Sequence, residues 1–178
     1  MTEISKKLEH AIRDIFDFPV KGIVFKDITP VLQDVNLFGE VIGLIADKFG
    51  GYKIDKIAGI ESRGFLFGMP LALKMGLPFV PVRKKGKLPA ETVSVTYKLE
   101  YGEACIEMHK DALKPGERVL IIDDLLATGG TTKAAIELVE KLGAEPVAAA
   151  FVVELGFLSG RNSISNNSSV EIFSILKY

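Results

Sequence analysis

The stretch Val119–Lys133 constrains the fold of this chain more than any other part of it. It reads Val-Leu-Ile-Ile-Asp-Asp-Leu-Leu-Ala-Thr-Gly-Gly-Thr-Thr-Lys. Its first four residues are apolar, and such a run after a Pro-Gly turn predicts a strand buried on both faces, as in a parallel sheet. Two carboxylates, Asp123 and Asp124, follow this strand, and the small-residue loop Ala127–Thr131 then leads into a helical pattern. Ligands bind at the carboxyl ends of strands in open α/β sheets, so we expect a site there.

The loop is suited to a phosphate. Gly129 and Gly130 permit backbone torsions closed to other residues and let a ligand approach the main chain. Free N–H groups and the positive end of the helix dipole favour an anion, and Thr128, Thr131 and Thr132 can add hydroxyl donors. The spacing is neither a Walker A loop nor a Gly-x-Gly-x-x-Gly fingerprint. A phosphate beside two carboxylates favours a sugar phosphate as the ligand, while a capped helix after an acidic turn is the plainer interpretation.

The whole string resembles the motif that binds phosphoribosyl pyrophosphate (PRPP) in type I phosphoribosyltransferases. In the form Asp-Asp-Leu-Leu-Ala-Thr-Gly-Gly-Thr it is similar to the adenine phosphoribosyltransferase family in particular. The resemblance implies that Asp123 and Asp124 hold the ribose 2′ and 3′ hydroxyls. It also implies that the 5′-phosphate is bound by the loop Ala127, Thr128, Gly129, Gly130 and Thr131, and that Leu126 is among the substrate-binding residues.

Length and composition fit a single domain spanning residues 1–178. Apolar residues make up 48% of the 178-residue chain, charged residues 25%, and the net charge is −1, which gives no indication of a nucleic-acid or membrane partner. No apolar run is long enough to span a bilayer, and the first residues lack a signal-peptide core. Cys105 is the only cysteine, which excludes an intrachain disulfide and a cysteine zinc cluster. We therefore expect a cytoplasmic protein.

The first thirty-odd residues predict a helix and then an irregular segment. Ile4, Leu8, Ile12 and Ile15 recur at helical spacing, which predicts an amphipathic helix over residues 3–16. The following segment, from Phe18 to Pro30, has prolines at both ends and an internal glycine, so we expect a loop or a short edge strand. Its apolar residues suit either the core or a wall for a flat base.

This segment resembles the Phe-Pro-x-x-Gly-x-x-Phe-Arg-Asp-Ile region of adenine phosphoribosyltransferases. The resemblance implies that residues 1–34 or so form a hood and that Val24, Phe25 and Lys26 line an adenine pocket. Lys26 stands where the family usually has arginine. Lysine lacks the planar fork of arginine and its stacking ability.

A second buried strand, Ile54–Ile60, ends in Glu61-Ser-Arg-Gly64 before an apolar helix over residues 65–75. By its position alone, Arg63 is either a surface arginine or the binding group for a second anion. The sequence Glu-Ser-Arg-Gly-Phe-Leu-Phe-Gly resembles the pyrophosphate loop of the family. The resemblance implies that Arg63, with the backbone of Ser62 and Gly64, holds the pyrophosphate, that Glu61 belongs to the same substrate-binding loop, and that Arg63 is catalytic.

A third buried strand, Leu77–Val82, is followed by Arg83-Lys-Lys-Gly-Lys87. A run of cations is usually a solvated face, but this one again follows the carboxyl end of a strand. A diphosphate needs positive charge that can close over it and then open. In the family this is the start of a mobile catalytic loop, which implies that Lys84 and Lys87 bind pyrophosphate and that Lys87 is catalytic.

Alternation of apolar and polar residues predicts a solvent-facing hairpin from Thr92–Tyr97 and Ala104–His109. Its tip, Leu99-Glu-Tyr-Gly102, matches a tetrapeptide of the family, which implies that Glu100 manages the purine N7 proton and that Tyr101 binds substrate. Further along, the pattern predicts a strand over 146–153, a surface connection over 159–169 and a last strand over 170–176.

Together these patterns predict an α/β fold: a mainly parallel twisted sheet with helices on both faces, and by resemblance the type I phosphoribosyltransferase fold with an N-terminal hood and a hairpin arm. Three loops gather at the strand ends: Glu61–Gly64, Arg83–Lys87 and Asp123–Thr131.

The implied function is purine salvage: transfer of the phosphoribosyl group from PRPP to N9 of adenine, giving AMP and pyrophosphate. Magnesium is expected to arrive with PRPP rather than on protein ligands, and the family is usually homodimeric. Two alternatives stay open: a PRPP-sensing regulator without catalysis, which needs a DNA-binding module, and a transferase for another purine such as xanthine.

Overall fold

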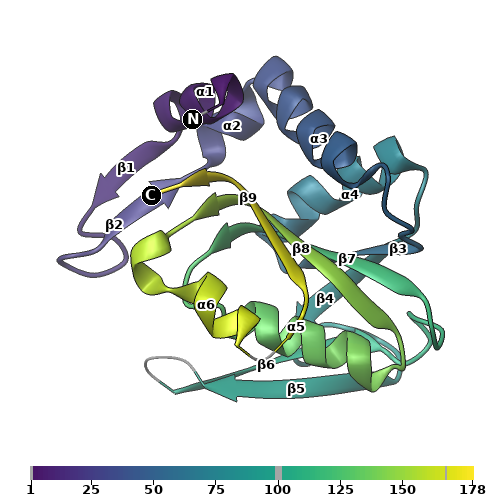
Figure 1. The fold of residues 1–178 in the computed structure, drawn as a ribbon. Coiled ribbons are helices and arrows are strands. Elements are labelled where there is room, and N and C mark those ends of the chain that lie inside the picture. Colours follow the sequence, from purple (N-terminus) through teal and green to yellow (C-terminus); the bar gives the residue numbers. More distant parts are fainter. Residues whose placement is uncertain (1, 99–101, 167) are drawn as a thin grey trace.

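A seven-stranded sheet forms the centre of the computed structural model, which describes residues 2–98, 102–166 and 168–178 (Figure 1). The strand order is β5-β6-β4-β3-β7-β8-β9, and the five strands from β4 to β9 in that order are parallel. The strands are β3 (Lys56–Ile60), β4 (Phe79–Lys84), β5 (Thr92–Lys98), β6 (Glu103–His109), β7 (Arg118–Leu126), β8 (Glu145–Glu154) and β9 (Glu171–Lys177). The predicted mainly parallel α/β sheet is confirmed.

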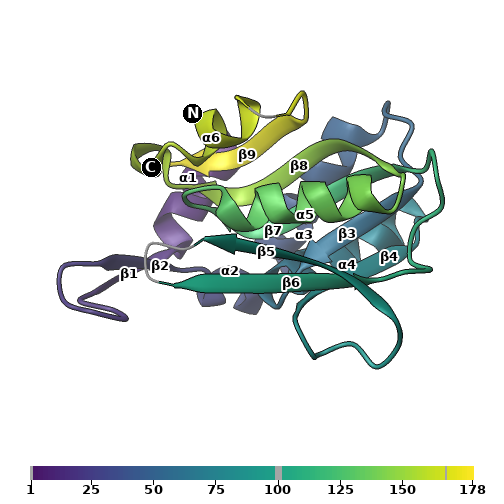
Figure 2. The ribbon, with the colours of Figure 1, turned by 90° about the horizontal axis from the view of Figure 1, so that it is seen from below.

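Helices cover both faces of this sheet, as the alternation of patterns predicted (Figures 1 and 2). They are α1 (Glu3–Ala11), α2 (Thr29–Gln33), α3 (Val35–Phe49), α4 (Arg63–Met75), α5 (Gly130–Lys141) and α6 (Gly160–Ser165), with a 3₁₀ turn at Gly156–Leu158. One apolar core joins α1, α3 and α4 to the sheet, and a second joins α5 and α6 to its other face. Leu120 and Ile122 of β7 belong to the first core and Ile121 to the second, because successive strand residues face opposite ways. No helix in the described part of the chain has the length and apolarity to cross a membrane.

The N-terminal prediction was partly wrong. The helix α1 ends at Ala11, and residues 13–16 form strand β1 (Arg13–Phe16), which pairs antiparallel with β2 (Val24–Asp27) in a separate two-stranded sheet. This hairpin projects from the body of the molecule (Figures 1 and 2). Pairing with β2 replaces the expected last helical turn, and two cross-strand ion pairs accompany it: Arg13 contacts Asp27 at 2.6 Å and Lys26 contacts Asp14 at 2.6 Å.

The hairpin β5–β6 does not stand free of the sheet, as a solvent-facing arm would. Strand β6 pairs antiparallel with β4, so the hairpin continues the main sheet at one edge. One face of it is covered, because Val95 and Ile106 are buried in the core under α5. The alternating pattern correctly predicted two strands, but helix α5, which lies further along the chain, determines which face of the hairpin is buried.

Two further expectations are corrected at the carboxyl ends of β7 and β8. Strand β7 does not stop before the acids but runs on to Leu126, since Asp123, Leu125 and Leu126 still pair with β8. The segment 159–169 is not merely a surface connection. It contains the short helix α6, whose Gly160 and Ile164 are buried.

Candidate active site

A cavity of about 530 Å³ opens at the carboxyl ends of β3, β4 and β7. Three segments meet there, and we name them the first loop (Glu61–Gly64), the basic run (Arg83–Lys87) and the glycine loop (Ala127–Thr131). The cavity brings together eleven of the predicted site residues: Glu61, Arg63, Lys84, Asp123, Asp124, Leu126, Ala127, Thr128, Gly129, Gly130 and Thr131. The parallel sheet explains this meeting, because it places the ends of successive parallel strands at one edge.

The glycine loop presents backbone N–H groups at the start of α5. Gly129 precedes the helix with φ of +83°, a left-handed conformation that strongly favours glycine. No side chain caps the first turn of α5, so its leading amides keep their donor capacity for a ligand. The hydroxyl of Tyr97 lies 3.1 Å from that of Thr131, which ties the loop to β5.

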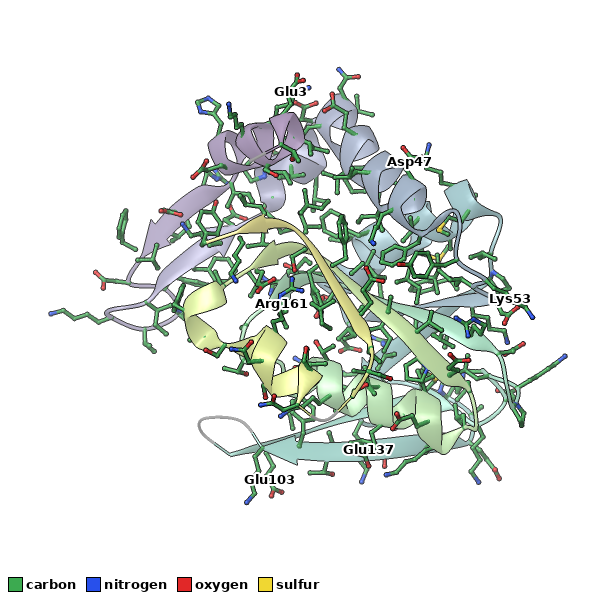
Figure 3. The ribbon with its side chains drawn as sticks, viewed as in Figure 1. Glu3, Asp47, Lys53, Glu103, Glu137 and Arg161 are labelled. Atoms are coloured by element: carbon green, nitrogen blue, oxygen red, sulfur yellow. The ribbon has the colours of Figure 1, made fainter. Side chains whose placement is uncertain are left out.

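Helix α6 supports the glycine loop from behind. A Cβ atom at Gly129 would lie 2.8 Å from the carbonyl oxygen of Gly160, and a Cβ at Gly160 would clash with the carbonyl of Ala127. Arg161, labelled in Figure 3, reaches from α6 to the end of β8, where its guanidinium contacts the buried carboxylate of Glu154 at 2.5 Å. The two glycines therefore allow a contact of backbone on backbone between α6 and the loop.

Asp123 and Asp124, the acidic pair, occupy the floor of the cavity. Burial raises the pKa of Asp123 well above its usual range, and the neighbouring Asp124 charge raises it further. Burial also raises the pKa of Asp124, while the guanidinium of Arg63, with Nε 3.0 Å from Oδ2, opposes that rise. Arg63 does not direct an N–H at this oxygen, so Asp124 Oδ2 is buried without a hydrogen bond in the described structure. The pair thus has acceptor capacity that a ligand can fill.

The first loop brings helix α4 against the acidic pair. A Cβ at Gly64 would lie 2.7 Å from the carbonyl oxygen of Ile122 and 3.1 Å from Asp123 Oδ1, so only glycine lets the helix start this close to β7. Arg63 lines the cavity and its guanidinium carbon lies 5.5 Å from the centre of the Phe25 ring. Ser62, joined to Glu61 by a cis peptide bond, is exposed, and neither Ser62 nor Gly64 lines the cavity.

The basic run leaves β4 beside the first loop. Lys84 and Lys85 line the cavity, whereas Lys87 is exposed and does not. Glu61 lines the cavity, and its Oε2 accepts from Arg83 Nε at 2.7 Å and from the backbone of Lys84 at 3.1 Å. In this structure Glu61 therefore holds the start of the basic run, and its predicted part in substrate binding stays a prediction.

The hood residues approach the site from the β1–β2 hairpin without lining the cavity. Val24 is exposed and Phe25 half-buried beside Arg63. The ammonium of Lys26 donates to Asp14 at 2.6 Å and lies 3.8 Å from the centre of the Tyr178 ring. The side chain of Lys26 is thus held between the hairpin and the end of the chain.

Several lining residues escaped the sequence-based prediction. They come from β3, β5, β6, the basic run and the end of β7: Ile60, Lys85, Tyr97, Ala104, Cys105, Ile106 and Leu125. Cys105 and Tyr97 were assigned only strand roles, and the pairing of β6 with β4 that turns them toward the site has no local signal. Glu100 and Tyr101 lie outside the described residues, so their predicted roles stay predictions.

Known proteins resemble this chain both in sequence and in fold. Residues 29–169 match the phosphoribosyl transferase domain family. The chain is 52% identical over 171 residues to the adenine phosphoribosyltransferase of Carboxydothermus hydrogenoformans, covering 96% of this chain and 99% of that protein.

Solved structures are equally similar. The adenine phosphoribosyltransferase of Thermoanaerobacter pseudethanolicus superposes with a TM-score of 0.92 at 52% identity, over 97% of this chain and 99% of that one. The Saccharomyces cerevisiae enzyme, solved with adenine and an imino-sugar bisphosphate, gives 0.91 at 42% identity, over 99% and 100%. With the motif, the fold and the cavity in agreement with these relatives, this chain belongs to the adenine phosphoribosyltransferase family of type I phosphoribosyltransferases.

Proposed function

We propose that this protein transfers the 5-phosphoribosyl group of PRPP to N9 of adenine, giving AMP and pyrophosphate in purine salvage. One observation carries the proposal: the acidic pair and the uncapped start of α5 open into the same 530 Å³ cavity. A ligand with a phosphate at one end and hydroxyls next to it satisfies both. The adenine bound to the yeast relative supports the choice of base.

The acidic pair suits a reaction in which positive charge develops. Both carboxyl groups have raised pKa values because they are buried, and Arg63 is the cation that opposes this for each. Ribose hydroxyls donating to Asp123 and Asp124, followed by a cation-like centre at C1, would favour the ionised carboxylates. The acidic pair then gives more electrostatic stabilisation to the transition state than to the bound substrate, and catalysis requires such a difference.

Pyrophosphate, the leaving group, is an anion and needs positively charged side chains to stabilise it. Arg63 and Lys84 line the cavity beside the acidic pair, and Lys87 stands at the outer end of the basic run. We assign these three cations, with the exposed Ser62 and the backbone of Gly64, to pyrophosphate, and the amides and hydroxyls of the glycine loop to the 5′-phosphate.

For the base, we assign Val24, Phe25 and the backbone of Lys26 to the adenine pocket. The Phe25 ring supports this, because it lies beside Arg63 at the edge of the site. Glu100 and Tyr101 complete the pocket in the proposal, with Glu100 acting at the N7 proton.

Magnesium enters the proposal with the substrate. Mg²⁺ is commonly held by one or two carboxylates together with substrate phosphates and water. Asp123 and Asp124 line the cavity and are carboxylates that could share such an ion with the substrate phosphates. The donor set therefore fits an ion that arrives on PRPP, where it would neutralise the diphosphate.

We further propose that residues 1–178 act as one domain in a homodimer in the cytoplasm. Helix α4 supports the dimer, because Leu66, Met69 and Leu73 follow one another on its outer side and are 44%, 46% and 75% exposed. Exposed apolar side chains at this spacing form a stripe on a single helix face. The family match over residues 29–169 supports the single domain.

The test is turnover of PRPP with a panel of bases. We expect AMP and pyrophosphate from adenine in the presence of Mg²⁺, no product with EDTA, and turnover of hypoxanthine, xanthine or orotate at least about a hundredfold slower, because a pocket built to hydrogen-bond one base leaves polar groups unpaired with another. Preference for another base would refute the choice of adenine and leave the transfer intact. Tight PRPP binding with no turnover of any base would favour a sensor.

A further inference from the structure

The backbone of the basic run converges on a single carboxylate. Glu107 of β6 accepts hydrogen bonds at Oε1 from three successive backbone amides, those of Gly86, Lys87 and Leu88, at 2.9, 3.1 and 3.1 Å. Its other oxygen accepts from the hydroxyl of Thr92 at 3.2 Å. A carboxylate with this many donors is well satisfied without a metal or a ligand.

Glu107 is buried, at 4% exposure, within the antiparallel edge of the sheet. Its neighbours across the strands are Arg83 on β4 and Ser94 on β5. No lysine or arginine of the described chain forms an ion pair with it within 4 Å, although Arg83 is next to it in register. The three backbone amides therefore stabilise the buried carboxylate, whose burial without such donors would be unfavourable.

The other carboxylate beside the basic run is used in a similar way. Glu61 accepts from Arg83 Nε and from the backbone of Lys84, and Arg83 in turn donates to the carbonyl of Lys87 at 3.2 Å. The main chain of the run is thus bonded on both sides. The ammonium groups of Lys84, Lys85 and Lys87 have no carboxylate within 4 Å in the part of the chain described, so their charge is left for an anion.

We propose that Glu107 is a positioning residue for the pyrophosphate end of the site. It fixes the backbone turn Gly86–Leu88, which sets where the ammonium groups of the basic run stand relative to the cavity, and it does so without neutralising them. This rests on the proposed function, since it assumes that the run meets a diphosphate. Glu107 itself touches no substrate in this role.

The experiment compares Glu107→Ala and Glu107→Gln with the wild-type protein. Alanine removes every acceptor, whereas the glutamine oxygen can still accept from the three amides and its NH₂ can donate to Thr92. The matched control is Glu117→Ala, because Glu117 also accepts a backbone amide, that of Lys114 at 2.7 Å, but before β7 at the opposite end of the sheet. Steady-state kinetics, calorimetric binding of pyrophosphate with Mg²⁺ and amide hydrogen exchange are measured for each.

We expect Glu107→Ala to raise KM for PRPP and Kd for pyrophosphate about tenfold while KM for adenine changes less than about twofold, a split that a general loss of folding does not give. Amides of Gly86–Leu88 should exchange at least about tenfold faster. Glu107→Gln should stay within about threefold of wild type in all of these. Glu117→Ala should lower Tm without altering either KM.

Three results for the Glu107 variants would overturn the proposal. Faster amide exchange in Glu107→Ala with unchanged pyrophosphate binding overturns the proposal, as does a glutamine variant as impaired as alanine or a parallel rise in both KM values. If wild-type protein binds PRPP and pyrophosphate but does not use adenine, the proposed function fails while the binding data still judge Glu107. If it binds neither anion, the proposal falls together with the function.

Discussion

The carboxyl group of Asp123 lies in surroundings that disfavour its own charge. Burial is the main cause of its raised pKa, and the adjacent Asp124 adds to it. When folding raises the pKa of an acid, the unfolded chain loses that proton at a lower pH than the folded chain does. Stability contributed by the protonated form is therefore lost as pH rises from the ordinary value of 3.8 through the folded pKa. Such a cost at a cavity floor is typical of a functional site.

Replacing Asp123 by asparagine should stabilise the protein and damage its activity. Asp123→Asn removes the charge but keeps the shape, so we expect Tm at pH 7.5 to rise, with the gain shrinking as pH falls through the folded pKa and vanishing below 3.8, where the wild-type group is protonated in both states. Because ribose would lose one acceptor carboxylate, kcat/KM for PRPP should fall about a hundredfold, or about 2.7 kcal/mol. Scanning calorimetry across pH and steady-state kinetics measure the two effects.

The matching change at a buried carboxylate away from the cavity should have the opposite sign. Burial raises the pKa of Glu154, but hydrogen bonds from Arg161 and Ser174 outweigh this, and the net pKa is lowered. Its contribution to stability is thus present at neutral pH and lost in acid, so Glu154→Gln should lower Tm. Equal loss of Tm in both variants would contradict our account of Asp123.

At the scale of the element, α6 matters more than its six residues suggest. Its Gly160 meets the carbonyl of Ala127 so closely that no side chain fits, and its Ile164 lies 3.2 Å from the position of a Cβ on Gly129. Lys133 of α5 donates to Ser163 at 2.8 Å. The conformation of the glycine loop is therefore set partly by a segment some thirty residues further along the chain.

Adding one methyl group at this contact should impair phosphate binding. We expect Gly160→Ala to push the carbonyl of Ala127 and move the glycine loop, which raises KM for PRPP about tenfold and lowers Tm by roughly 2–4 °C per kcal/mol of strain. The control is Gly39→Ala, at an exposed position in the second turn of α3 with open space around it, which should raise Tm slightly because alanine favours a helix. Unchanged PRPP kinetics in Gly160→Ala would show that the loop does not depend on α6.

At the scale of the whole molecule, helix α4 carries both a residue of the site and an exposed apolar stripe. Arg63 begins α4 and lines the cavity, while Leu66, Met69 and Leu73 lie exposed further along it. An interface over this stripe would lie next to the first loop. Dimerisation would then stiffen the element that carries Arg63.

A charge in the stripe should therefore separate the subunits. We expect Leu73→Glu to shift the sedimenting species from twice 19.4 kDa to the single-chain mass, because a buried unpaired carboxylate is costly at an interface. Phe157→Glu is the control, since Phe157 is 73% exposed in a turn on another part of the surface. Wild-type protein that sediments as a monomer at micromolar concentration would refute the dimer.

Local pattern was enough for the elements that carry the site and for much of the site itself. The apolar runs and their acidic, basic or glycine-rich ends predicted β3, β4, β7 and α5. Such segments report their structure because burial on both faces of a strand, or on one face of a helix, shapes the sequence of that segment alone. The meeting of three loops at one sheet edge followed from parallel order.

The tertiary structure decided what depended on partners far away in the chain. The helical spacing through Ile15 gave way to a hairpin because residues 24–27 offered β1 a strand to pair with. Tyr97 and Cys105 face the cavity only because β6 pairs with β4. In the sequence, Glu107 is an ordinary polar residue of an alternating strand, and only the tertiary structure brings the backbone of Gly86–Leu88 to its carboxylate. These outcomes rest on pairing and close packing between distant segments, and such contacts leave little trace in the residues on either side of them.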